Sequence, residues 1–117
     1  TSVAADVSGT EAGKAFVEKY TATYGRPPEA FSAYGYDAMN VAINGIKAAI
    51  ESAGGLPTRE QVASAVRATR GFKGLASNVT LNDIGDNVEA TIFVLGFDKA
   101  SYPPTPIKSI PAAEYLN

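Results

Sequence analysis

The sequence contains no cysteine, no histidine and no tryptophan among its 117 residues, and these absences exclude several kinds of site. Without thiolate or imidazole ligands, zinc, haem and iron–sulfur centres are not expected. The same absence removes Ser–His and Cys–His catalytic pairs, and with them the usual general base near neutral pH. We therefore expect a protein that is not an enzyme and that carries neither a metal nor another cofactor.

Charge and long apolar runs are also scarce. Charged residues make up 19% of the chain and the formal net charge is −2. A nucleic-acid-binding surface needs clustered basic side chains, so no nucleic-acid partner is expected. No run of apolar residues is long enough to span a bilayer. The chain begins with Thr1 and shows no leader-like segment, which predicts a processed or truncated product.

Apolar residues account for 45% of the sequence, and in the first part they recur at helical spacing. A first helix is expected over about residues 10–24. Ser8 and Glu11 have the spacing of a capping box, and Gly25 is suited to end the helix. Its aromatic residues are spaced four apart and should share one face: Phe16, Tyr20 and Tyr24.

A second, longer helix is expected from Pro28 or Glu29 to Ala53. Large apolar residues at alternating spacings of three and four predict a core-facing seam: Tyr36, Met39, Ile43, Ile46 and Ile50. The flanking residues are mostly Ala and Gly, which predicts burial on more than one side of the helix. A third helix is expected over about residues 58–69, with a capping box formed by Thr58 and Gln61.

After Gly71 the apolar period changes from that of a helix to that of a strand. Val79 and Leu81 predict a short strand, followed by a polar turn over residues 82–86. A strong strand is expected over residues 89–98, apolar on both faces and therefore in need of cover on both sides. The four prolines that follow predict an extended arm. The few strands expected are not enough to cover both apolar faces of this strand. The chain therefore either oligomerises or is part of a larger protein.

Several of these segments, in this order, carry a family resemblance. They are FVEKY-x3-YG over residues 16–25, the triplet Tyr36-Asp37-Ala38, Phe72-x-Gly74, the polar turn over residues 81–86 and the Ile-Phe-Val strand that starts at Ile92. Together they resemble the C-terminal part of type I periplasmic solute-binding proteins, and in particular the branched-chain amino acid-binding family of ABC transporters.

The resemblance implies an α/β fold, a partial type I periplasmic-binding-protein fold of three helices plus a few C-terminal strands. Members have two lobes joined by three crossovers and trap ligand by hinge closure. By this analogy residues 1–84 form the helical C-terminal part of lobe one. Residues 85–98 then form the third crossover and the return strand to lobe two, and residues 99–117 a Pro-rich arm.

The same resemblance implies that Phe31, Ala33 and Tyr34 line the ligand cleft. The alternative is that these residues belong to the core beneath a sheet. Asp37 is predicted to be structural, since a carboxylate near a helix N-terminus is favoured by the helix dipole. The acidic residues of the turn, Asp83 and Asp86, lack the spacing of a calcium-binding loop and predict a solvated turn.

The implied function is that of the solute-binding component of an ABC importer. Its expected partners are an amino acid or small organic carboxylate, a membrane-bound ABC permease and the remainder of its own two-lobed chain. Its expected location is the periplasm, or the cell surface as a lipoprotein in a Gram-positive source. Two alternatives stay open: a ligand-sensing domain of a receptor or regulator with this fold, and a self-contained domain that forms a homo-oligomer.

Overall fold

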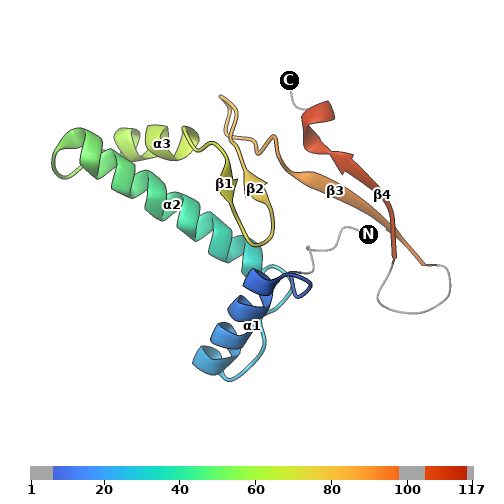
Figure 1. The fold of residues 1–117 in the computed structure, drawn as a ribbon. Helices are drawn as coiled ribbons and strands as arrows, with labels where there is room; N and C mark the ends of the chain where they lie inside the picture. Colours follow the sequence, from blue (N-terminus) through green and yellow to red (C-terminus); the bar gives the residue numbers. More distant parts are fainter. Residues whose placement is uncertain (1–6, 98–104, 116–117) are drawn as a thin grey trace.

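The computed structural model describes residues 7–97 and 105–115, and it contains helices followed by strand pairs (Figure 1). The elements lie in the following order: α1 (Glu11–Tyr24), α2 (Ser32–Ala53), α3 (Arg59–Arg67), β1 (Phe72–Lys73), β2 (Asn78–Val79), β3 (Thr91–Gly96), β4 (Thr105–Pro111) and a 3-10 turn, η1 (Ala112–Glu114). The expected fold class, three helices with a few C-terminal strands, is confirmed. None of the helices in the described ranges is both long and apolar enough to cross a membrane.

Helix α1 ends as predicted but begins with a different cap. The side chain of Thr10, not Ser8, accepts a hydrogen bond from the backbone N–H of Gly13 at 3.0 Å. Gly25 adopts a left-handed conformation, with φ of 70°, and its N–H bonds to the carbonyl of Thr21. The aromatic face is confirmed, because the rings of Tyr20 and Tyr24 lie 4.6 Å apart between centroids.

The large apolar residues of helix α2 predict that their own face is buried, but the structure buries the opposite face. The buried positions are mostly small: Ala33, Asp37, Val41, Gly45 and Ala49. The predicted core seam is exposed along its length: Tyr36, Met39, Ile43, Ile46 and Ile50. The prediction that this seam lies in the core is therefore wrong for the described residues: α3 packs on the small-residue face, the ring of Phe16 from α1 contacts Tyr36, and the other seam residues stay exposed. Burial on several sides is likewise not seen.

The small residues allow α2 and α3 to approach closely. A Cβ atom at Gly45 would overlap the side chain of Val66 and would lie only 3.0 Å from its Cα. Helix α3 begins with the predicted capping box, in which Thr58 and Gln61 each bond to the other's backbone N–H. Its apolar residues are half-buried rather than fully buried, since α2 is the one helix that covers them.

The chain then turns through the small antiparallel pair β1–β2, in which Phe72 pairs with Val79. Leu81, expected to be part of a strand, forms an isolated bridge to Asn87. The turn between them is confirmed: the side chain of Asn82 accepts hydrogen bonds from the N–H groups of Ile84 and Asp86, and Gly85 has a φ of 96°.

The proline-rich C-terminal segment is a strand, so the prediction of an unpacked arm is wrong for its described part. Strand β4 pairs antiparallel with β3, from Thr91 opposite Pro111 to Gly96 opposite Thr105. A register shift leaves Ile107 as an extra residue next to Pro106. Proline lacks an N–H and is tolerated at the edge or end of a sheet and next to a bulge, which is where both prolines lie. Pro103 and Pro104 lie outside the described residues.

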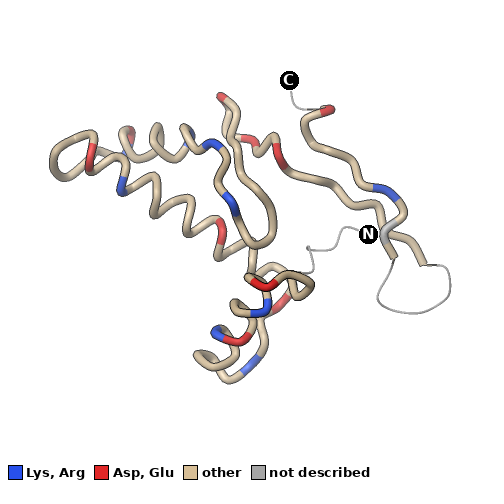
Figure 2. Tube along the Cα trace, in the orientation of Figure 1, with Lys and Arg blue, Asp and Glu red and all other residues tan. Residues whose placement is uncertain are grey.

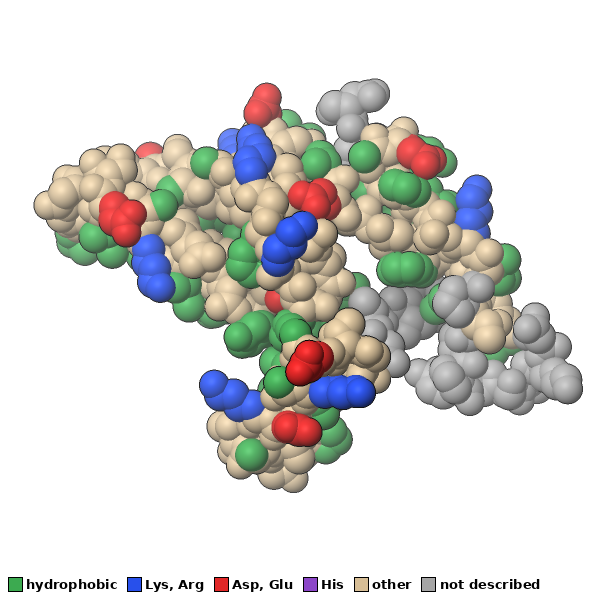
Figure 3. Space-filling model, viewed as in Figure 1, with side chains coloured by type: hydrophobic (Ala, Val, Ile, Leu, Met, Phe, Trp, Pro, Cys, Tyr) green, Lys and Arg blue, Asp and Glu red, His purple; other side chains and the backbone are tan. Residues whose placement is uncertain are grey.

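The elements do not close around one core. The accessible surface is 8375 Å² and the radius of gyration is 16.9 Å. A compact chain of this size would expose about 6,000 Å² and have a radius of about 13 Å. Hydrophobic side chains accordingly lie exposed along the edge of α2 that faces away from α3, and on the β3–β4 pair (Figure 3). The prediction of an uncovered strand is confirmed: Ile92 and Val94 on one face, and Phe93 and Phe97 on the other, remain exposed.

Candidate functional site

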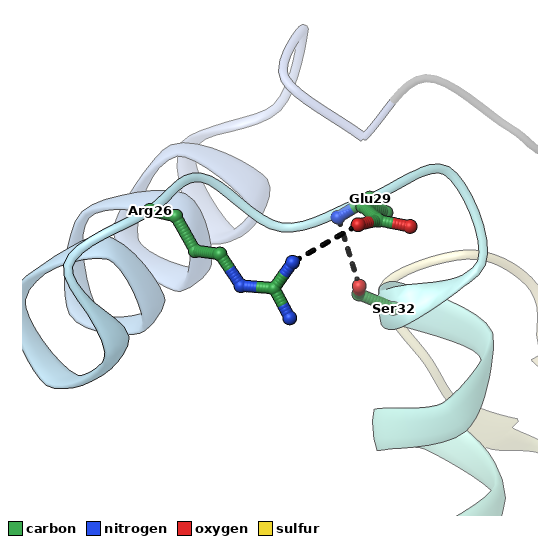
Figure 4. Close-up of polar contacts among 3 residues, drawn as sticks. All are labelled: Arg26, Glu29 and Ser32. Carbon is green, nitrogen blue, oxygen red and sulfur yellow. Dashed lines mark hydrogen bonds and ion pairs between the residues drawn. The ribbon is translucent and has the colours of Figure 1, made fainter.

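The candidate site lies at the start of α2, and a short hydrogen-bonded loop leads into it (Figure 4). The N–H of Glu29 donates to the hydroxyl of Ser32 at 3.0 Å, and the N–H of Ser32 donates back to the carbonyl of Glu29 at 2.9 Å. Arg26 forms an ion pair with the Glu29 carboxylate at 3.1 Å, but both side chains are exposed, so the pair adds little stability. The loop bonds, rather than a cap, set where α2 begins.

Phe31 occupies the N-cap position of α2 and makes no side-chain cap hydrogen bond. A phenyl ring cannot accept the N–H bonds that Ser, Thr, Asp or Asn would accept there, so helix formation does not explain this residue. Its side chain is 69% exposed. A large apolar ring at a position that favours a polar residue indicates a contact beyond the local helix, with a ligand or with another part of the protein.

The three predicted site residues divide between two sides of the helix. The rings of Phe31 and Tyr34 lie on the same side, with centroids 6.3 Å apart and planes tilted by 46°. Tyr34 is 37% exposed, whereas Ala33 is only 3% exposed. The structure thus brings the two aromatic residues together as one accessible surface, whereas Ala33 is buried and is not part of that surface. The assignment of all three to a ligand cleft stays a prediction.

Asp37 has the structural role that the sequence predicts, although not through the helix dipole alone. It is 5% exposed, and its two carboxylate oxygens accept the backbone N–H groups of Leu75 and Ala76, each at 2.8 Å. These partners are 38 and 39 residues away in the sequence. Charge-assisted bonds of this kind are stronger than neutral ones, so Asp37 holds the β1–β2 turn against α2.

A concave surface that was not predicted from the sequence lies between α1 and α2, apart from the aromatic pair. It is an open groove of about 730 Å³ that the predicted site residues do not line. Its apolar walls come largely from four aromatic residues: Phe16, Tyr20, Tyr24 and Tyr36. The sequence feature related to this groove is the four-residue spacing of the aromatic residues on the first helix. That spacing alone indicates an apolar face and does not predict a groove. The rings of Phe16 and Tyr36 meet across it at 5.3 Å.

Charged groups do not gather at either surface. Basic and acidic residues are both spread over the helices, the turns and the strands (Figure 2). Within residues 7–97 and 105–115, no three Asp or Glu residues lie close enough together to hold a metal ion. The arrangement at the start of α2, an aromatic surface with neighbouring hydroxyl groups, suits contact with an apolar part of a small organic molecule.

The fold is a small α/β fragment, and comparison with known proteins gives its family. A family model described as periplasmic binding protein matches residues 1–100, so the chain belongs to the periplasmic binding protein family. The family resemblance stated from the sequence is confirmed.

Among solved structures, the chain is similar to the leucine binding protein LivK from Thermotoga maritima MSB8, with 31% sequence identity and a TM-score of 0.60. That match covers 90% of this chain but 28% of the LivK chain. A comparison with curated proteins found no match. The matched family and structure are binding proteins and not enzymes.

Proposed function

We propose that this chain supplies one wall of the ligand cleft in a two-lobed solute-binding protein of an ABC importer. The solute is an amino acid with an apolar side chain, or a small organic carboxylate. It is trapped by hinge closure and delivered, chemically unchanged, to a membrane permease. The protein acts in the periplasm or at the cell surface, as periplasmic binding proteins generally do. Membership of that family and the similarity to a leucine binding protein support this proposal.

The observation that carries the proposal is the exposed aromatic pair at the start of α2. Phe31 stands where local helix formation favours a polar residue, and its ring lies beside that of Tyr34. Two adjacent rings offer an apolar surface for an aliphatic side chain, with the tyrosine hydroxyl at its edge. Ala33 is buried at the same end of α2 and is proposed to line the cleft wall with them.

The proposal is tested by isothermal titration of the complete reading frame that contains residues 1–117, using L-leucine, L-isoleucine, L-valine and a set of small organic carboxylates. Replacing Phe31 with Ala should weaken binding by about 1–3 kcal/mol, the value of burying one large apolar side chain. The control is Tyr115→Ala, which removes another exposed aromatic ring far along the chain and should leave the affinity unchanged. Equal affinities for parent and Phe31→Ala would remove Phe31 from the cleft. Absence of binding to apolar amino acids and carboxylates would contradict the solute class.

A further inference from the structure

Two sequence motifs that are far apart along the chain meet at the turn of the β1–β2 hairpin. The Asp37 carboxylate receives the N–H groups of Leu75 and Ala76, as described above. The neighbouring residue must be glycine, because a Cβ at Gly74 would overlap both the Asp37 carboxylate and the carbonyl oxygen of Ser77. The motifs Tyr36-Asp37-Ala38 and Phe72-x-Gly74 therefore form one unit, in which a buried carboxylate fixes the hairpin turn to α2.

The other end of the hairpin is fixed to residues 85–90 by the side chain of Asn87. Its oxygen accepts the N–H groups of Thr80 at 3.0 Å and of Glu89 at 3.1 Å, and its nitrogen donates to the carbonyl of Asn78 at 2.9 Å. The Thr80 hydroxyl accepts the N–H of Gly71 at 2.8 Å and donates to the Glu89 carboxylate. The end of β2 is thus bonded directly to this segment, and the start of β1 is connected to it through the Thr80 hydroxyl.

We propose that residues 71–80 form a strut between α2 and the segment 85–90. Asp37 and Asn87 are the two positioning residues at its ends, and a displacement at one end is transmitted to the other through the paired strands. This strut connects the proposed ligand contact with the predicted crossover between lobes. Helix α2 begins with the aromatic pair, and residues 85–90 are predicted to cross between the lobes. This use of the strut rests on the proposed function, whereas the mechanical coupling itself does not.

The coupling is tested by amide hydrogen exchange in the complete reading frame, without ligand, for parent and Asp37→Asn. Asparagine keeps the shape of the side chain but turns an NH₂ group toward a backbone N–H. Exchange at Leu75 and Ala76 should accelerate about tenfold, and exchange at Thr80 and Glu89, at the far end, about threefold or more. Amides of α3 should be unaffected. Asp83→Asn makes the same chemical change on an exposed turn outside the strut and should alter none of these rates.

The reverse experiment uses Thr80→Val, which removes one hydroxyl at the far end and keeps the proposal testable if Asp37→Asn does not fold. It should accelerate Leu75 and Ala76 as well as Glu89. Acceleration confined to the altered end overturns the strut, and so does an equal acceleration throughout α3, which would report loss of global stability. Titration of the parent with the apolar amino acids and small organic carboxylates of the proposed solute class is a separate measurement: failure to bind any of them contradicts the proposed function and leaves the exchange result intact.

Discussion

Helix α2 has two apolar faces, and the contrast between them shows what residue size contributes to the fold. The face of small residues is closed by α3, with Gly45 against Val66. The face of large residues is exposed, although each large side chain could contribute about 1.5–3 kcal/mol if fully buried. Small residues therefore mark close contact between neighbouring helices, whereas the large residues mark a surface that the described elements leave uncovered.

The largest expected effect tests the close contact. Gly45→Ala introduces a methyl group that overlaps Val66, so we expect a loss of about 1–3 kcal/mol in the free energy of unfolding. Gly35→Ala is the matched control on the same helix. A Cβ there meets no atom within 4 Å, so the better helix propensity of Ala should stabilise the protein, by at most about 1 kcal/mol. Urea unfolding of the complete reading frame measures both. A shift of both midpoints in the same direction would show that the two positions do not differ in packing.

The next effect tests whether the exposed seam is covered outside residues 1–117. Ile46 is 42% exposed, so Ile46→Gln should change the stability of the isolated chain by less than about 0.5 kcal/mol. In the complete reading frame, a covering element would raise that cost to about 1–2 kcal/mol. Comparison of the urea midpoints of the two chains, each with and without the substitution, gives the result. Equal small costs in both would mean that the seam stays exposed.

The sequence predicts the local features of this fold well. Gly25 ends its helix in the left-handed conformation, Thr58 and Gln61 form the capping box, and Asn82 shapes the polar turn. Each of these depends on interactions within a few residues. The start of α1 is an exception: the sequence predicts Ser8 as the capping residue, whereas Thr10, two residues further along, is the N-cap in the structure.

The features that escaped prediction depend on partners distant in the sequence. The bonds of Asp37 to the hairpin turn span 38 residues, and nothing local distinguishes this carboxylate from one that favours a helix N-terminus. Strand β4 depends on pairing with β3, which overrides the usual effect of its prolines. For the candidate site, the cleft role of Phe31 stays a prediction from the family resemblance. The groove beside α1 depends on the angle between two helices, which residue spacing does not give.

A smaller effect concerns how α3 is held in place to cover the small-residue face. Thr58→Ala removes half of the capping box and should lower the free energy of unfolding by about 1 kcal/mol. Thr23→Ala is a suitable control, because the hydroxyl of Thr23 bonds to the carbonyl of Lys19 within α1 and caps no helix start. Circular dichroism during thermal unfolding measures both. If Thr58→Ala melts like the parent, packing against α2 alone fixes the start of α3.

The smallest effect is a pH dependence at the same helix end. Hydrogen bonds from its own backbone N–H and from the Thr58 side chain lower the pKa of Glu60 below the ordinary value of 4.5. Because the folded-state pKa is the lower one, the carboxylate stabilises the protein above the unfolded-state pKa, and this contribution is lost as the pH falls through the folded-state pKa. Glu60→Gln should therefore be slightly less stable than the parent at about pH 6, and the difference should shrink as the pH is lowered to about 3. Glu18→Gln, on α1, controls for the change in net charge. If the stability difference between Glu60→Gln and the parent is the same at both pH values, the charge of the carboxylate does not support α3. The small-residue face of α2 is then closed by packing alone.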